Sequence, residues 1–295
     1  MTTDTGRSLG ERIASGDRSF SFEFFPPRDE AGEDQLWSAV RALEPYRPTF
    51  VSVTYGAGGS SRDTTVRITG RIARETTLLP VAHLTCVGHT REELEAILDE
   101  YAAGGVRHVM ALRGDPEGGP KATWTPTEGG LEYACDLVEL AAARQFRIGV
   151  AAFPEKHPNS PSRDHDAEVL VAKANAGAEF AVTQMFFTAD HYVAMVDRVR
   201  ARGVDIPILP GIMPILNLAA IRRQGDLIGA DVPPAIVDRI RAHEGDSARM
   251  RAEGIQIATE LCQDLLERGA PGLHFYTLNR SRATLEIFEA LKITV

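Results

Sequence analysis

The stretch Ser-Phe-Ser-Phe-Glu-Phe-Phe-Pro-Pro-Arg, residues 19–28, predicts a buried strand near the start of the chain. Aromatic residues are dense in it, as is typical of strands, and the two prolines end it abruptly. Alternation places its first three phenylalanines on one face and Ser21 and Glu23 on the other. Because a buried unpaired charge is costly, we expect Glu23 to have a buried partner, to be protonated, or to lie where a cationic or proton-accepting ligand binds.

The rest of the chain alternates this strand pattern with helical periodicity. Apolar, β-rich stretches occur at residues 19–26, 50–55, 80–86, 108–114, 147–154, 180–186, 206–212 and 273–278. Helical spacing occurs between them at residues 33–43, 63–75, 91–103, 131–144, 166–176, 189–202, 218–229 and 281–291. Strands that alternate with helices predict a parallel sheet, and eight units in 295 residues favour a (β/α)8 TIM barrel over an open doubly wound sheet.

Two regions depart from a plain repeat. A longer segment at about residues 218–268 predicts two or three helices between the seventh and eighth strands. Residues 1–17 are polar, and we expect a partly flexible tail with a first turn at residues 9–15. No linker or tandem repeat interrupts the chain, so we expect residues 1–295 to form a single catalytic barrel domain.

Composition excludes some classes of protein. Acidic residues outnumber basic ones by 41 to 32, and the formal charge of -9 works against binding to nucleic acid or anionic lipid. The three cysteines form no CxxC motif, so we expect a reduced compartment with neither disulfides nor structural zinc. No apolar run is long enough to span a bilayer or to act as a signal core. We therefore expect a cytoplasmic protein with small-molecule ligands, and a homo-oligomer stays open.

Barrel enzymes place their chemistry at the carboxyl ends of the strands. Polar residues stand at almost every such end: Glu23, Thr54, Tyr55, His83, Thr85, Arg113, Asp115, Glu155, His157, Gln184, Tyr276, Asn279 and Arg280. This distribution favours an enzyme over an inert scaffold. The last group, Tyr276, Asn279 and Arg280, suits a planar anionic ligand, with Arg280 as a natural clamp for a carboxylate.

Glu23 and Asp115 are the leading acid and base candidates. A glutamate in an apolar setting has its pKa raised from about 4.3, so we expect Glu23 to hold a proton near neutrality. Asp115 follows a strand directly and either faces a ligand or serves as a turn or N-cap residue. His157 lies on a proline-rich loop and is either a surface histidine or a binding residue.

Metal and phosphate motifs are weak in this sequence. His83 and Cys86 fall on opposite faces of their strand, and no third ligand lies near in sequence, so we expect no catalytic metal. Residues 56–61, Gly-Ala-Gly-Gly-Ser-Ser, lack the third glycine of GxGxxG and the lysine of a P-loop. Any dinucleotide is therefore expected to bind by another route.

Several segments taken together resemble methylenetetrahydrofolate reductase. They are FEFFPPR at 22–28, FVSVTYGA at 50–57, HLTC at 83–86, ALRGD at 111–115, TQMFF at 183–187, PGIMP at 210–214 and FYTLNR at 275–280. They occur in the order of the family over nearly the whole chain. The resemblance implies a flavin-containing barrel that reduces 5,10-methylenetetrahydrofolate to 5-methyltetrahydrofolate with NADH or NADPH, similar to the bacterial form that lacks a regulatory domain.

The resemblance also implies roles for individual residues. Glu23 matches the general acid that opens the imidazolidine ring to a 5-iminium cation, and Asp115 matches a carboxylate that stabilises this cation. Folate contacts are implied for Gln184, Tyr276 and Arg280. Positions that line the flavin site are implied for Thr54, His83, Arg113, Tyr133, Ala134, His157, Asp166 and Lys173.

Three positions depart from the family pattern. Val169 and Ala172 stand where an Asn and an Arg usually help to hold FAD, and Leu218 stands where a Phe often stacks on nicotinamide or folate. A charged hydrogen bond contributes about 1.5–3 kcal/mol, so its loss should weaken FAD binding. FAD as a cofactor therefore stays open, and without it hydride would pass directly from NADH to the iminium carbon.

Two other functions stay open beside the reductase. One is a barrel pterin methyltransferase or lyase in which Glu23 acts as a base, and the other is a folate-binding barrel without turnover. NADH oxidation that depends on methylenetetrahydrofolate would separate the reductase from both.

Overall fold

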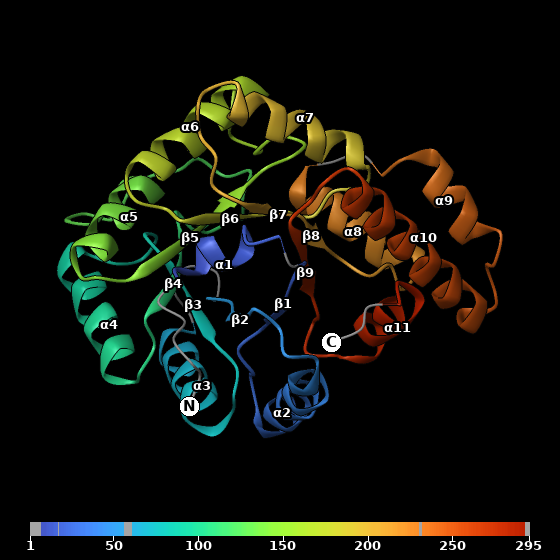
Figure 1. The fold of residues 1–295 in the computed structure, drawn as a ribbon, viewed down its shortest axis with the longest axis horizontal. Helices are drawn as coiled ribbons and strands as arrows, with labels where there is room; N and C mark the ends of the chain where they lie inside the picture. The colour runs from blue at the N-terminus through green and yellow to red at the C-terminus, as the bar shows by residue number, and fades with distance from the viewer. Residues whose placement is uncertain (1–6, 17, 56–60, 230–231, 293–295) are drawn as a thin grey trace.

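The structure is a computed structural model that describes residues 7–16, 18–55, 61–229 and 232–292. Its strands are β1 (Ser19–Phe24), β2 (Phe50–Val53), β3 (Pro80–Thr85), β4 (His108–Leu112), β5 (Arg147–Ala152), β6 (Phe180–Thr183), β7 (Ile208–Leu209), β8 (Gly211–Ile212) and β9 (Gly272–Tyr276). They form one parallel sheet in the order β7-β6-β5-β4-β3-β2-β1-β9-β8. Helices surround the strands (Figure 1), and the predicted TIM barrel is confirmed.

The predicted seventh strand is present in two pieces. β7 pairs with β6 and β8 pairs with β9, and Pro210 lies between the two pieces. Proline has no N–H for the ladder, so the strand is interrupted at this residue. The carbonyl of Pro210 still accepts a hydrogen bond from the His274 N–H at 3.0 Å. The sheet thus closes into a barrel through this broken strand.

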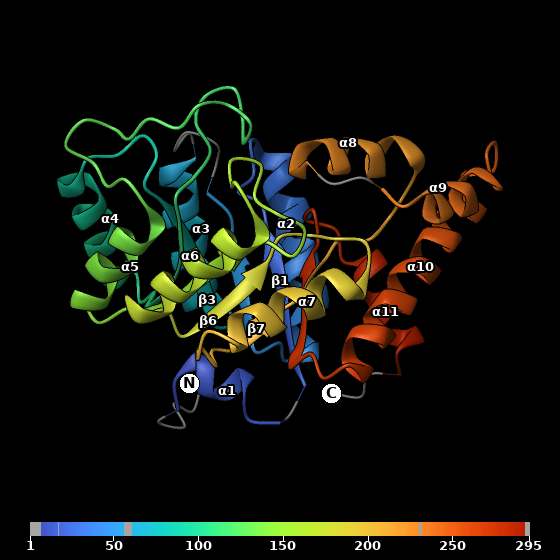
Figure 2. The ribbon, with the colours of Figure 1, turned by 90° about the horizontal axis from the view of Figure 1, so that it is seen from above.

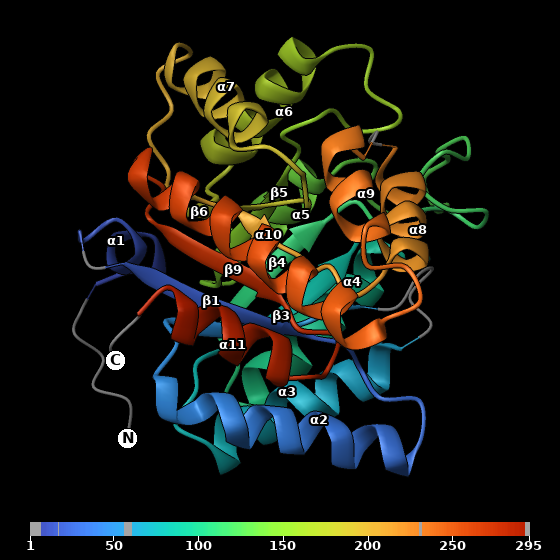
Figure 3. The ribbon, with the colours of Figure 1, turned by 90° about the vertical axis from the view of Figure 1, so that its right-hand side faces the viewer.

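The helices follow the strands in the predicted alternation. They are α1 (Leu9–Ile13), α2 (Glu30–Leu43), the 3-10 helix η1 (Glu44–Tyr46), α3 (Arg62–Glu75), α4 (Arg91–Ala103), α5 (Ala134–Ala143), α6 (Arg163–Asn175), α7 (Ala189–Arg200), α8 (Leu218–Ile228), α9 (Pro234–Arg241), α10 (Ser247–Glu267) and α11 (Arg282–Ala290). The predicted insert is confirmed as three helices, α8 to α10, with α10 packed beside α11 (Figure 3). No helix of the described ranges is long and apolar enough to cross a membrane.

The short helix α1 lies where the sequence predicted a first turn, within residues 9–15. Leu9 and Ile13 are 1% exposed and pack against inward-facing strand residues, among them Phe50, Val81 and Phe180. A capping box between Ser8 and Glu11 begins the helix. Figure 2 shows α1 at the end of the barrel opposite α8. Burial of the two side chains contributes about 1.5–3 kcal/mol each, and α1 closes this end of the barrel interior.

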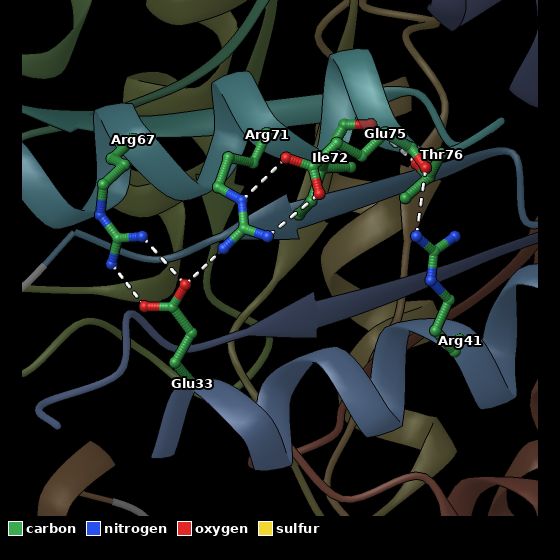
Figure 4. A network of polar contacts seen from close by, with 7 residues as sticks. All are labelled: Glu33, Arg41, Arg67, Arg71, Ile72, Glu75 and Thr76. Atoms are coloured by element: carbon green, nitrogen blue, oxygen red, sulfur yellow. Dashed lines mark hydrogen bonds and ion pairs between the residues drawn. The ribbon is translucent and has the colours of Figure 1, made fainter. Parts of the chain in front are cut away.

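An ion-pair network joins α2 to α3 on the outside of the barrel (Figure 4). Glu33 accepts two hydrogen bonds from Arg67, at 2.9 and 2.6 Å, and a third from Arg71. The bonds from Arg67 are the main reason that the pKa of Glu33 is lowered to about 2. A cavity of about 560 Å³ lies beside this network, lined in part by Arg28 and Trp37. None of the predicted site residues lines this cavity.

Candidate active site

Glu23 lies inside the barrel on β1, as the alternation predicted. Its carboxylate is flanked by the neighbouring strands, because Glu23 is in register with Ser52 of β2 and with Tyr276 of β9. The residue is 6% exposed, whereas Phe22 and Phe24 face the outer hydrophobic core. Three alternatives were expected for Glu23: a buried partner, a bound proton, or a position beside a ligand. The structure supplies buried partners.

The partners of Glu23 all approach the same carboxylate oxygen. The Ser52 hydroxyl donates to Oε2 at 3.3 Å, and Nε2 of His83 and Nε2 of His274 lie 3.3 and 3.4 Å from it. The other oxygen, Oε1, has no hydrogen-bond partner within the described part of the chain. The backbone of Glu23 is also fixed, since its carbonyl accepts from the Thr277 hydroxyl at 2.6 Å.

The prediction that the pKa of Glu23 is raised is wrong. Burial by itself raises this pKa, but the charges and hydrogen bonds of His83 and His274 outweigh burial and lower it to about 2. The predicted apolar setting is absent because the neighbouring strands place serine and histidine side chains opposite the carboxylate. The two imidazoles therefore favour the ionised form of Glu23.

His274 was missed as a site residue, because the sequence pattern His-Phe-Tyr was equally consistent with a core strand. Its Nδ1 lies 2.8 Å from the Ser21 hydroxyl, and its fully buried ring stacks on Phe50 at 5.7 Å. Ser21, His274 and Glu23 thus form a continuous hydrogen-bonded chain. The alternation of side chains along each strand could have identified His274. Ser21 and Glu23 share one face of β1, and His274 and Tyr276 share one face of β9.

Tyr276 connects this group to β6 and the insert. The Tyr276 hydroxyl donates to the Thr183 carbonyl at 2.6 Å. The Tyr276 ring lies against Gly211, and a Cβ atom added at Gly211 would be only 2.7 Å from the Tyr276 hydroxyl oxygen. Gln184 follows Thr183 and is half-buried. Leu218, at the start of α8, packs in the same apolar cluster as Tyr276. The structure therefore brings Glu23, Tyr276, Gln184 and Leu218 to one region of the barrel.

A second group follows β4. The guanidinium carbon of Arg113 lies 4.8 Å from the ring centre of Trp124, and its buried Nη2 has no hydrogen-bond partner among the described residues. Desolvation raises the pKa of Asp115, and the charge of Arg113 offsets part of this rise. No direct contact joins Asp115 to Glu23 in the described part, and β2 and β3 separate their strands. No pattern in the sequence singled out Trp124.

His157, Asp166 and Lys173 meet between the loop after β5 and helix α6. The Asp166 carboxylate accepts from the His157 N–H at 3.0 Å, and His157 Nδ1 accepts from the Asn159 N–H at 3.1 Å. Burial is the main cause that lowers the pKa of His157 to about 4, and Arg113 and Lys173 lower it further. Lys173 is buried, its Nζ donates to the Ala151 carbonyl at 2.9 Å, and burial lowers its pKa to about 8.

We expect His157→Gln to reduce the acid sensitivity of the fold. The neutral ring is favoured in the folded state mainly because burial disfavours the charged form, and protonation of Nδ1 would also remove the acceptor of the Asn159 N–H. Its pKa lies below the ordinary 6.5, so this stabilisation is present above about pH 6.5 and is lost as the pH falls towards about 4. With screening, the wild type should lose about 1–2 kcal/mol over this range through His157.

Urea unfolding at about pH 7 and about pH 4.5 checks this prediction. His165→Gln, a change of an exposed histidine on α6, is the control and should keep the pH dependence of the wild type. An equal acid loss in wild type and His157→Gln would contradict the assignment.

The remaining predicted positions are more scattered. Thr54 is half-buried and its N–H donates to the Phe24 carbonyl at 2.9 Å. Tyr133 is 52% exposed at the N-cap of α5, and Ala134 is buried as the first residue of that helix. Arg280 is exposed beyond β9. Most of the glycine-rich stretch at 56–61, namely residues 56–60, lies outside the described residues.

The side chains of helix α6 bear on whether the site can hold a flavin. A flavin dinucleotide carries a diphosphate, which needs cations or N–H donors. At the two positions where the family pattern supplies side-chain donors, Val169 is 37% exposed and Ala172 is exposed, and neither side chain can donate. Lys173 is turned inward onto Ala151. Positions 169 and 172 of α6 therefore offer no side-chain donor to a flavin diphosphate, although the buried Nη2 of Arg113, just after β4, remains available as a donor.

Solved structures were similar to this chain in fold. An uncharacterized protein from Clostridium thermocellum, described as binding two copies of 5-methyl-5,6,7,8-tetrahydrofolic acid, superimposes with a TM-score of 0.61. The match covers 96% of this chain and 97% of that one at 13% sequence identity. Similarity at this identity shows the fold alone.

Sequence comparison gives the family. The family described as methylenetetrahydrofolate reductase matches residues 8–292. The 5,10-methylenetetrahydrofolate reductase of Pectobacterium carotovorum subsp. carotovorum is 38% identical over 291 residues, covering 97% of this chain and 95% of the relative. Methylenetetrahydrofolate reductase 1 of Schizosaccharomyces pombe is 37% identical over 277 residues, covering 92% of this chain, which spans 46% of that relative. The chain belongs to the methylenetetrahydrofolate reductase family.

Proposed function

We propose that the protein reduces 5,10-methylenetetrahydrofolate to 5-methyltetrahydrofolate with a reduced nicotinamide nucleotide as the hydride source. The family supports the overall reaction. The observation that carries the mechanism is the asymmetry of Glu23, whose Oε2 is held by three neighbours while Oε1 has no partner in the described part of the chain. A carboxylic acid anchored through one oxygen can present a proton on the other.

In this mechanism Glu23 is the general acid. Its Oε1–H protonates N10 of the bound substrate, the bond between N10 and the methylene carbon breaks, and a 5-iminium cation forms. Oε2 can still accept from Ser52 and from a neutral His274 with its proton on Nε2, since the hydroxyl of Ser21 can then donate to Nδ1. The protonated acid is thus compatible with every hydrogen bond of the group.

The low pKa of Glu23 does not oppose this role. Burial raises this pKa, and the charge and hydrogen-bond contributions of His83 and His274 outweigh burial, so the shift describes the carboxylate with no ligand beside it. A basic ligand atom beside Oε1 accepts a hydrogen bond from the protonated acid and so favours that form of Glu23. Once Glu23 is ionised, its negative charge also stabilises the neighbouring iminium.

Hydride then reaches the methylene carbon of the iminium. Because Val169 and Ala172 do not provide side-chain donors for a flavin diphosphate, we propose direct transfer from the nicotinamide ring, which yields the 5-methyl product and the oxidised nucleotide. Asp115 is proposed to stabilise the cation through charge. Gln184 and Tyr276 are proposed to contact the pterin, Leu218 to pack against a bound ring, and Arg280 to bind the glutamate carboxylate.

The absorption spectrum and steady-state kinetics of the purified protein test this function. We expect a colourless protein that oxidises NADH only when methylenetetrahydrofolate is present, at a rate unchanged by added FAD. Direct transfer needs both substrates bound together, so double-reciprocal plots at several NADH concentrations should intersect. Parallel plots, or turnover that requires FAD, would reject the direct route. Absence of folate-dependent NADH oxidation in all conditions would reject the reductase and favour a methyltransferase, a lyase or a binding protein.

A further inference from the structure

The turn that follows β9 has an unusual backbone. The Arg280 N–H donates to the Thr277 carbonyl at 2.9 Å, and the two residues between them have positive φ, 52° at Leu278 and 56° at Asn279. A turn with two positive φ values is normally built from glycine, asparagine or aspartate. Asparagine tolerates this region, whereas a bulky leucine is an outlier. The strain at Leu278 persists only if the surroundings over-determine the turn.

Asn279 supplies that constraint. Its side chain is 8% exposed and makes two hydrogen bonds to the backbone of one residue, Phe25. Oδ1 accepts from the Phe25 N–H at 2.8 Å, and Nδ2 donates to the Phe25 carbonyl at 2.9 Å. Its own N–H donates to the Thr277 hydroxyl at 3.2 Å, and this hydroxyl donates to the Glu23 carbonyl. The amide therefore ties the turn after β9 to the residues that follow Glu23.

The strained turn gains little from burial. Leu278 is 38% exposed and Phe25 is 37% exposed, and they are two of the four large apolar side chains that are exposed in the described part of the chain. Asn279 holds both residues, one through the turn and one through its side chain. Backbone strain that persists at an exposed leucine is typical of ligand-binding sites rather than of a packed core, and both side chains are open to a ligand.

We propose that Asn279 is a positioning residue that fixes Phe25 and Leu278 as two apolar walls for the non-reacting tail of the folate. This proposal rests on the proposed function. The tail consists of a flat aromatic ring followed by a glutamate. Phe25 and Leu278 suit the ring, and Arg280, the next residue of the turn, suits the carboxylate. Asn279 touches neither the pterin nor the nucleotide and acts through its neighbours.

Binding of two ligands separates positioning from a general loss of structure. The ligands are 5-methyltetrahydrofolate and a tetrahydropterin that lacks the aryl-glutamate tail, each measured by calorimetry. Asn279→Gly keeps the backbone conformation accessible and removes both bonds to Phe25. We expect it to weaken folate binding about tenfold, as for the loss of two hydrogen bonds that order a site. Binding of the tail-less pterin should change less than about twofold.

Two further variants and a control sharpen the result. Asn279→Asp keeps the acceptor and loses the donor, so its folate affinity should fall between wild type and Asn279→Gly. Leu278→Gly removes the strain and one wall, so we expect a melting temperature equal to wild type or about 2 °C higher, with weaker folate binding. Gln35→Ala removes an exposed hydrogen bond from Nε2 to the Asn279 carbonyl, 3.1 Å in length, and should bind both ligands like wild type.

Equal weakening for both ligands in Asn279→Gly, or no weakening for either, would overturn the positioning role. A Leu278→Gly variant that melts lower and binds folate normally would also overturn it, because Leu278 would then be structural. The readout does not depend on turnover. Wild type that binds folate in a tail-dependent way but never oxidises NADH would refute the reductase while leaving the positioning role supported.

Discussion

Glu23→Gln is expected to lower kcat for methylenetetrahydrofolate reduction by about 10²–10⁴-fold, the range for loss of a general acid. The amide has nearly the same size and keeps an oxygen that accepts from Ser52 and His274. It cannot release a proton to N10, so the ring does not open. Steady-state NADH oxidation in the presence of methylenetetrahydrofolate measures the loss, while NADH binding, followed by fluorescence, should remain near that of wild type.

The control for this prediction is Ser52→Ala. It removes one donor to Oε2, at 3.3 Å in the native protein, and leaves the acid and both histidines in place. We expect a reduction in kcat of less than about tenfold, in line with one weak hydrogen bond. If Glu23→Gln turns over at the wild-type rate, Glu23 is not the acid, and another group must open the ring.

The architecture was predictable because it rests on local patterns. Helix α4 (Arg91–Ala103) begins and ends where the sequence placed it, since Thr90 and Glu93 form a capping box at one end and Gly104 caps the other. The break between β7 and β8 was not predicted. The hydrophobic run at 206–212 reads as one strand, and the effect of Pro210 depends on which neighbours pair on either side of it.

The direction of Glu23 was predictable, but its electrostatic environment was not. Alternation along one strand reports which face a side chain takes. The partners Ser52, His83 and His274 come from three other strands, and their distance from the carboxylate depends on the register of the closed barrel. The sign of the pKa shift was therefore wrong, because burial was considered without these neighbours.

The turn after β9 was also only partly predictable from the sequence. Asn279 is a residue that favours turns and left-handed backbone, so its presence at a strand end is unremarkable in sequence. Leu278 does not favour positive φ, and no pattern in the sequence predicts the value of 52°. The conformation is imposed by the bonds between Asn279 and Phe25, which are 254 residues apart in the chain.

We expect His274→Gln to lower steady-state kcat by about tenfold to a hundredfold, while single-turnover reduction stays near the wild-type rate. A glutamine can donate to Glu23 but cannot take up and release a proton, so an acid that is loaded before mixing still reacts once, and its reloading is slow. Removal of one of the two imidazoles that lower the pKa of Glu23 should also raise that pKa above about 2, which favours the protonated acid relative to wild type.

Rapid mixing of enzyme and NADH with excess methylenetetrahydrofolate resolves the two phases. The variant should show a fast first turnover followed by a slow steady state. Ser21→Ala should keep a steady state close to that of wild type, because it leaves the imidazole beside Glu23. His274→Ala is less informative, since His274 is fully buried and truncation leaves a cavity. An equal loss in the first and later turnovers of His274→Gln would mean that His274 orients Glu23 and does not return its proton.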